Sequence, residues 1–186
     1  MTTVRSPPDG APAPGSGRAC SPELIETAIV HEPIALQFLA PADADDARAT
    51  LQGVRRVHQR DGWRAAAVEV AAALGIDPHN QETEPDVTQF PFTEQRGANF
   101  ERFLTSDLDA ALTDTLRLAD IPRDGRIIPA VGTTSPKDGF DYLASLALVD
   151  HIGVPVQALP GGHNGNLTHQ IHAKDVPSAV GLGTKV

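Results

Sequence analysis

The chain has 186 residues, of which 40% are hydrophobic and only 4% aromatic, so we expect one domain whose core is built from Ala, Leu, Val and Ile. The formal net charge of -9 argues against binding to nucleic acid or to an anionic membrane, because the electrostatic contribution would be repulsive. A single cysteine, Cys20, excludes an internal disulfide and any Cys-x-x-Cys metal or redox site.

The first 21 residues are dominated by Pro, Gly, Ala and Ser, and this composition predicts a disordered leader over residues 1–21. Arg5 is not followed by the apolar stretch of a secretory signal. No apolar run in the chain approaches the roughly 18 residues that a membrane helix needs. We therefore expect a cytoplasmic protein, without a membrane as partner, whose folded domain covers residues 22–186.

A short apolar run at residues 27–30 predicts a strand that is buried on both faces, as in a parallel sheet. The run leads into His31, Glu32 and Pro33, and the proline ends the strand because it has no backbone N–H to donate. Glu32 is therefore expected at the carboxyl end of the strand, where open α/β sheets keep their functional groups. We assign residues 22–40 to this strand and its end.

Residues 41–120 are predicted to form a helical insertion. The spacing of their apolar residues indicates a series of helices, over residues 42–60, 63–74, 97–104 and 107–119. Asp61 and Gly62 form a turn between the first two helices, and Asp107 is a plausible N-cap for the last. Residues 76–95 are polar, contain three prolines and are predicted to be a loop.

Residues 121–169 predict a strand–loop–helix–strand unit, and strands connected in this way run parallel. The expected elements are a strand at 126–131, a loop at 132–135, a helix at 140–152 and a strand at 154–159. Pro160, Gly161 and Gly162 break the second strand and leave His163 at the tip of a glycine-rich turn. Residues 170–186 show no clear period and are predicted to be an irregular tail.

The order of these features resembles the C-terminal half of an α/β-hydrolase. The matching segments are ETAIVHEP (26–33), RGANFERFL (96–104), RIIPAVGTTS (126–135) and VPVQALPGGHNGNLTH (154–169). The resemblance implies a partial α/β-hydrolase fold with about three parallel strands, in which the helices of residues 41–120 form a cap. Members of that fold hydrolyse esters, lactones, amides, epoxides or carbon–halogen bonds, so a small-molecule substrate is implied but not specified.

By the same resemblance, His163 is the base that activates the nucleophile. The acid that orients it usually follows the second strand of this half at a Gly-x-x-Asp, but here that position is Gly132-Thr-Thr-Ser. Some members of the fold place the acid where this chain has Glu32, which would bond one ring nitrogen of His163 and fix its tautomer. Asp138 and Asp141 are the alternatives.

A nucleophile elbow, Gly-x-Ser-x-Gly, is expected before the strand that ends at Glu32, and neither that sequence nor its Cys or Asp equivalent occurs in the chain. Ser16 lies between two glycines but lacks a flanking strand and helix, and Cys20 is no better placed. We therefore expect a truncated α/β-hydrolase with impaired or no catalysis, whose leading residues come from a truncated or frame-shifted gene. Its nucleophile would be water or a group from another chain.

The alternative is a non-catalytic fragment that acts as an interaction module. Missing sheet neighbours would leave the edge of the strand that ends at Glu32 unpaired, and such an edge favours self-association. Neither interpretation requires a cofactor. The spacing of His163, His169 and His172 does not place all three on one face of a regular element, so no metal site is predicted.

Overall fold

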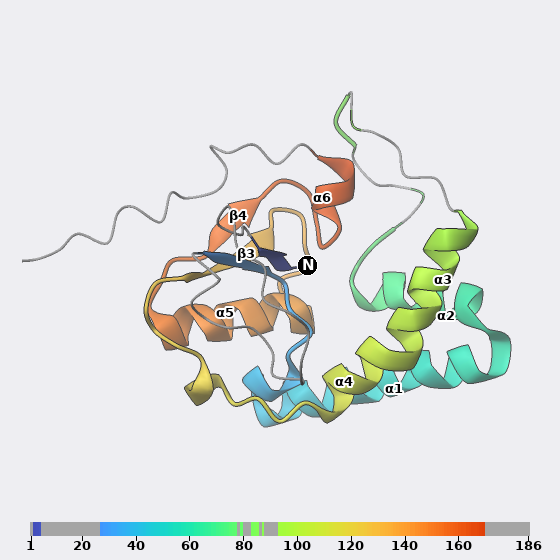
Figure 1. Ribbon diagram of the computed structural model, residues 1–186, viewed down its shortest axis with the longest axis horizontal. Coiled ribbons are helices and arrows are strands. Elements are labelled where there is room, and N and C mark those ends of the chain that lie inside the picture. The colour runs from blue at the N-terminus through green and yellow to red at the C-terminus, as the bar shows by residue number, and fades with distance from the viewer. Residues whose placement is uncertain are drawn as a thin grey trace, which may run out of the picture.

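The computed structural model describes residues 2–4, 27–77, 79, 83–85, 87 and 93–169. Within these residues a four-stranded sheet and one helix lie beside a group of helices (Figure 1). The sheet has the order β1-β2-β3-β4. Its strands are β1 (Thr2–Val4), β2 (Ala28–His31), β3 (Ile127–Gly132) and β4 (Gln157–Leu159). Because β2, β3 and β4 run parallel, the predicted α/β class with three parallel strands is confirmed.

The parallel register brings the carboxyl ends of β2, β3 and β4 to the same end of the sheet. His31 is paired with Ala130, and the backbone N–H of Glu32 donates to the Ala130 carbonyl over 3.1 Å. Gly132 is paired with Leu159. The residues that follow the three strands therefore meet at one edge, as expected for functional groups in a parallel sheet.

The helical segment contains α1 (Pro41–Asp61), α2 (Trp63–Ala73), α3 (Glu94–Arg102), the π-helix η3 (Phe103–Asp107) and α4 (Leu108–Thr113). Two 3-10 turns flank it, η2 (Leu36–Phe38) and η4 (Leu118–Asp120). Leu51, Val54 and Leu108, each 3% exposed or less, belong to the core shared by these helices. Across the described ranges, no helix has the length and apolar character needed to cross a membrane.

The α5 helix (Phe140–Ile152) packs under the sheet against β3 (Figure 1). The hydroxyl of its buried Ser145 donates to the Ala130 carbonyl over 3.1 Å, which fixes the helix to the middle of the sheet. Phe140 at its first turn extends into the core of the helical segment. This helix therefore connects the two parts of the fold, and a short helix, α6 (Gly165–Thr168), follows β4.

The helix boundaries around residues 94–120 differ from those predicted. Thr93 caps α3 by accepting a bond from the Arg96 N–H, so the helix starts earlier than residue 97. Asp107 is no N-cap: its backbone is helical, because η3 joins α3 to α4 without a break. The last helix ends at Thr113 instead of residue 119, since the Asp114 carboxylate accepts bonds from the Leu116 N–H and the Gln37 side chain.

The described N-terminal residues also differ from the sequence prediction. Thr2–Val4 form β1, which pairs antiparallel with Ala28–Val30, so these three residues do not belong to a disordered leader. Two threonines and a valine favour extended backbone, and β2 offers them its free N–H and carbonyl groups. The edge of β2, at which self-association was expected, is thus occupied by β1. The remainder of the predicted leader and the tail at 170–186 lie outside the described residues.

A pair of glycine substitutions tests one helix end and one helix interior. Gly153 ends α5 with φ of 72°, and nothing lies within 4 Å of an added Cβ, so we expect Gly153→Ala to lower the free energy of unfolding by about 1 kcal/mol. Gly53 lies within α1, where only the Arg56 guanidinium approaches an added Cβ, at 3.7 Å. Gly53→Ala should raise the free energy of unfolding by about 0.5–1 kcal/mol. Urea denaturation measures both changes, and equal signs would contradict the assigned conformations.

Candidate functional site

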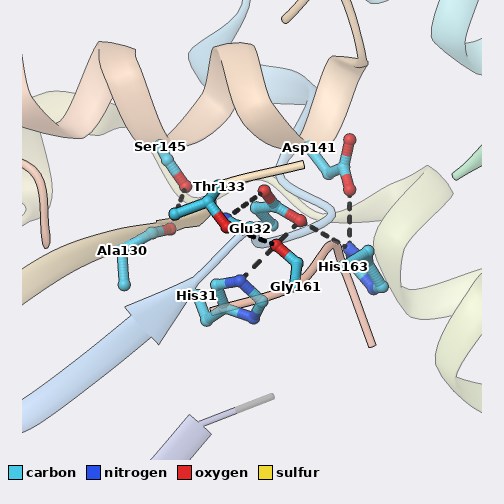
Figure 2. A network of polar contacts seen from close by, with 9 residues as sticks. His31, Glu32, Ala130, Thr133, Asp141, Ser145, Gly161 and His163 are labelled. Carbon is cyan, nitrogen blue, oxygen red and sulfur yellow. Dashed lines mark hydrogen bonds and ion pairs between the residues drawn. The ribbon is translucent and has the colours of Figure 1, made fainter. Parts of the chain in front are cut away.

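Two carboxylates face one nitrogen of His163 at the carboxyl end of the sheet (Figure 2). The Nδ1 atom of His163 lies 2.6 Å from Oδ2 of Asp141 and 3.2 Å from Oε2 of Glu32. Glu32 follows β2, Asp141 lies in the first turn of α5, and His163 follows β4, so three separate elements supply the cluster. Both acids are buried, with 1% of Glu32 and 3% of Asp141 exposed.

The position of Glu32 depends on an uncommon backbone conformation. Its φ of 43° lies in the left-handed region, which a non-glycine residue adopts only at a cost in free energy. The Glu32 side chain is fixed in place, because the Gly132 N–H donates to its Oε1 atom over 2.8 Å. Glu32 therefore spans the ends of β2 and β3 with one carboxylate oxygen and reaches His163 with the other.

Glycine at position 132 allows the loops after β3 and β4 to meet. A Cβ at Gly132 would lie 2.5 Å from the Ser135 hydroxyl and 2.6 Å from the Gly161 carbonyl, which are impossible separations. The two loops are joined by bonds from the Thr133 N–H to the Leu159 carbonyl and from the Thr134 N–H to the Gly161 carbonyl. This contact fixes the start of the turn that carries His163.

Asp141 is oriented by the packing of α5. The helix is held on the sheet by Ser145, one turn further along, and Gly139 precedes it with a backbone that leaves no room for a side chain beside Asp141. An added Cβ at Gly139 would lie 2.8 Å from Oδ1 of Asp141. The first turn of a helix also favours a carboxylate, because the unpaired N–H groups there carry partial positive charge.

The two acids change the proton affinity of His163. Burial alone would lower the pKa of the ring, but the bonds to Asp141 and Glu32 outweigh this effect and raise the pKa of His163 to about 9. Burial likewise disfavours ionised Glu32, yet its contacts with His163, Ser135 and the Gly132 N–H lower the pKa of this carboxyl group to about 2. At neutral pH His163 is therefore an imidazolium beside an ionised Glu32.

A second histidine, His31, lies next to His163. The rings of His31 and His163 are stacked with their centroids 6.1 Å apart, and His31 is only 7% exposed. Burial lowers the pKa of His31, and the nearby Glu32 charge offsets part of that effect. His31 thus presents a largely neutral ring to the charged one at neutral pH.

A cavity of about 330 Å³ opens beside His163. Its walls come from the loop after β3, the turn after β4 and the segment that follows α2. The polar groups that line it include Asp77, Thr134, Asn164, Thr168 and His169. A small molecule held there would lie directly against the His163 turn.

The structure brings together both residues that the sequence singled out, Glu32 and His163. Of the alternatives, Asp141 reaches His163. Asp138 is exposed, and none of the contacts found among the described residues joins it to His163. Ser16, Cys20 and His172 lie outside the described residues. Sequence reasoning did not find the stacking of His31 or the bond from the Gly132 N–H, since neither has a local sequence signal.

Glu32, Asp141 and His163 also include atoms that could ligate a metal ion, because one atom from each lies within 4.8 Å of the others. Two ligands of a tetrahedral zinc ion at about 2.1 Å are roughly 3.4 Å apart. The 2.6 Å between Nδ1 of His163 and Oδ2 of Asp141 is shorter and has the length of a charge-assisted hydrogen bond. The geometry thus fits an acid–histidine cluster better than a zinc centre.

Comparisons with protein-family models, with curated proteins and with solved structures gave no match.

Proposed function

We propose that this chain is a hydrolase of the α/β-hydrolase type, in which His163 is the general base for attack on a small ester, lactone or amide. The observation that supports it is the contact of His163 Nδ1 with two buried carboxylates at the end of a parallel sheet, beside a cavity. A carboxylate on Nδ1 keeps the proton on that atom and leaves Nε2 as the acceptor in the neutral ring.

The proton would follow a short path. Nε2 of His163 takes a proton from the attacking oxygen as that oxygen bonds to the carbonyl carbon, and the carbonyl oxygen becomes an oxyanion. The resulting imidazolium is stabilised by Glu32 and Asp141, and it returns the proton to the leaving alkoxide or amine as the carbon–oxygen or carbon–nitrogen bond breaks. Because the sequence has no Gly-x-Ser-x-Gly elbow, the attacking group is water or comes from a second chain.

The raised pKa of His163 restricts the pH at which this base is available. With a pKa of about 9, only about 1% of the ring is neutral at pH 7. The rate would therefore increase about tenfold for each pH unit up to that pKa. The proposed hydrolase is an alkaline one.

A second candidate is a non-catalytic interaction module. The observation that favours it is the lack of a nucleophile elbow in the sequence, which leaves the histidine without a partner that it could activate. In that case the charged cluster would serve the stability of the fold alone.

We expect p-nitrophenyl acetate to be hydrolysed faster than in buffer, with a rate that rises between pH 6 and pH 9. His163→Gln keeps a hydrogen-bond donor for the acids but cannot accept a proton, and it should reduce the rate about 10²–10⁴-fold or to the level of buffer. The control is His151→Gln at the opposite end of α5, where the ring contacts the Ile121 carbonyl and Arg123. Circular dichroism verifies that each variant is folded.

Hydrolysis by folded His163→Gln at the wild-type rate would contradict the role of His163 as base. No hydrolysis by the wild-type chain at any pH up to 10 would contradict the catalytic proposal and leave the interaction module.

A further inference from the structure

The two acids at His163 are not equivalent. Oδ2 of Asp141 lies 2.6 Å from Nδ1, whereas Oε2 of Glu32 lies 3.2 Å away. Nδ1 carries one proton, and a single N–H forms its strong, nearly linear hydrogen bond with one acceptor. The shorter distance identifies that acceptor as Asp141.

We propose that Asp141 is a positioning residue that holds the Nδ1 proton of His163, and that Glu32 is a second, fixed negative charge beside the same ring. This deepens the proposed function and rests on it only for the effect on catalysis. Glu32, the acid expected from the sequence resemblance, thus supplies negative charge. The hydrogen bond that orients the His163 ring comes from Asp141, which the sequence offered only as an alternative.

The surroundings of the two acids support this division. Glu32 is already engaged by the Gly132 N–H and lies 3.9 Å from Nε2 of His31, so its carboxylate is shared among several neighbours. For the Asp141 side chain, the hydrogen bond to His163 is the one found among the described residues. Its buried carboxylate is therefore committed to the histidine.

The charges that face the ring come from two elements. Glu32 and His31 approach from the end of β2 and Asp141 approaches from α5, while Asp77 and His169 line the adjoining cavity. One imidazolium between two carboxylates leaves an excess negative charge, which strengthens the hold on the proton. Of the two acids, Asp141 contributes more to holding this proton, because its contact with Nδ1 is the shorter one.

The test is an NMR titration of His163 between pH 5 and pH 11 in the wild-type chain and in three variants. Asp141→Asn should lower the midpoint of the titration by more than one pH unit. Glu32→Gln should lower it by less, and the control Asp138→Asn, an exposed acid near the start of the same helix, should leave it unchanged. A midpoint in Asp141→Asn equal to that in Asp138→Asn, or a larger change in Glu32→Gln, would overturn the proposal.

A measurement on the wild-type chain keeps the test independent of how the variants fold. Nuclear Overhauser effects from the Nδ1–H proton of His163 should be stronger to the β-protons of Asp141 than to the γ-protons of Glu32. The reverse order would overturn the assignment.

The kinetic consequence separates this inference from the proposed function. If His163 is a catalytic base, Asp141→Asn should hydrolyse p-nitrophenyl acetate about 10²–10⁴-fold more slowly than the wild type, because the neutral ring no longer keeps its proton on Nδ1 and Nε2 is lost as the acceptor. A lowered titration midpoint without hydrolysis in any variant would support the role of Asp141 and contradict the hydrolase. Hydrolysis that depends on His163 but is equal in wild type and Asp141→Asn, with equal titration midpoints, would support the hydrolase and contradict the role of Asp141.

Discussion

Replacing His163 by alanine is expected to lower the free energy of unfolding at pH 7 by about 3–5 kcal/mol. The imidazolium is the positive charge between Glu32 and Asp141, whose exposed fractions are 1% and 3%. Without it, two buried carboxylates lie close together with no cation beside them. Urea denaturation followed by circular dichroism measures the loss.

Two further variants show whether the loss comes from charge. Neutralising both acids in the same chain, as Glu32→Gln and Asp141→Asn together with His163→Ala, should recover a large part of the stability. His151→Ala removes a histidine from the far end of α5, where the ring is partly exposed, and should cost less than about 1 kcal/mol. A loss in His163→Ala no greater than in His151→Ala would show that the buried acids do not depend on His163.

The stability of the wild-type chain is expected to fall by about 3 kcal/mol as the pH rises from about 6.5 to above 9. The pKa of His163 is raised from 6.5 in the unfolded chain to about 9 in the folded one. The folded state therefore holds this proton more tightly, and the stabilisation is complete below pH 6.5 and lost as the pH rises through 9.

The loss of stability at low pH follows from Glu32, whose pKa is lowered from 4.5 to about 2. Its stabilisation is present above pH 4.5 and lost as the pH falls towards 2. Both changes describe largely the same ion pair, so their free energies are not added. Together they place the greatest stability between about pH 4.5 and 6.5.

Urea midpoints at pH 5.5, 7.5 and 9.5 test this profile. The midpoint should decrease from the first to the last, and the decrease should be much smaller in His163→Gln, which has no ring to titrate. A wild-type midpoint that is constant, or that rises towards pH 9.5, would contradict the raised pKa of His163.

The elements that the sequence predicted well are those with local signals. The apolar runs that became β2 and β3, and the helical spacing of α5, are bounded by proline or glycine at or near their ends. Glu32 and His163 were found for a similar reason, because Glu32 directly follows β2 and His163 lies in the Pro/Gly turn that follows β4. Their meeting follows from parallel pairing, which brings the ends of neighbouring strands together.

The features that were not predicted depend on contacts between distant parts of the chain. The sequence offered Asp138 and Asp141 as equal alternatives, and only the packing of α5 on β3 decides that Asp141 points towards His163. The pairing of Thr2–Val4 with β2 likewise joins segments more than twenty residues apart. The uninterrupted helical path through η3 depends on burial of Leu104 and Leu108 in the shared core, which overrides the local capping preference of Asp107.

We infer that His163 is a partly buried imidazolium whose Nδ1 atom is held by two buried carboxylates. The ¹⁵N chemical shifts of its ring nitrogens in the wild-type chain at pH 7.5 test this most directly, because they distinguish the protonated ring from either neutral tautomer. The structure predicts that both nitrogens carry a proton at this pH. A neutral ring, with one nitrogen unprotonated, would contradict the claim.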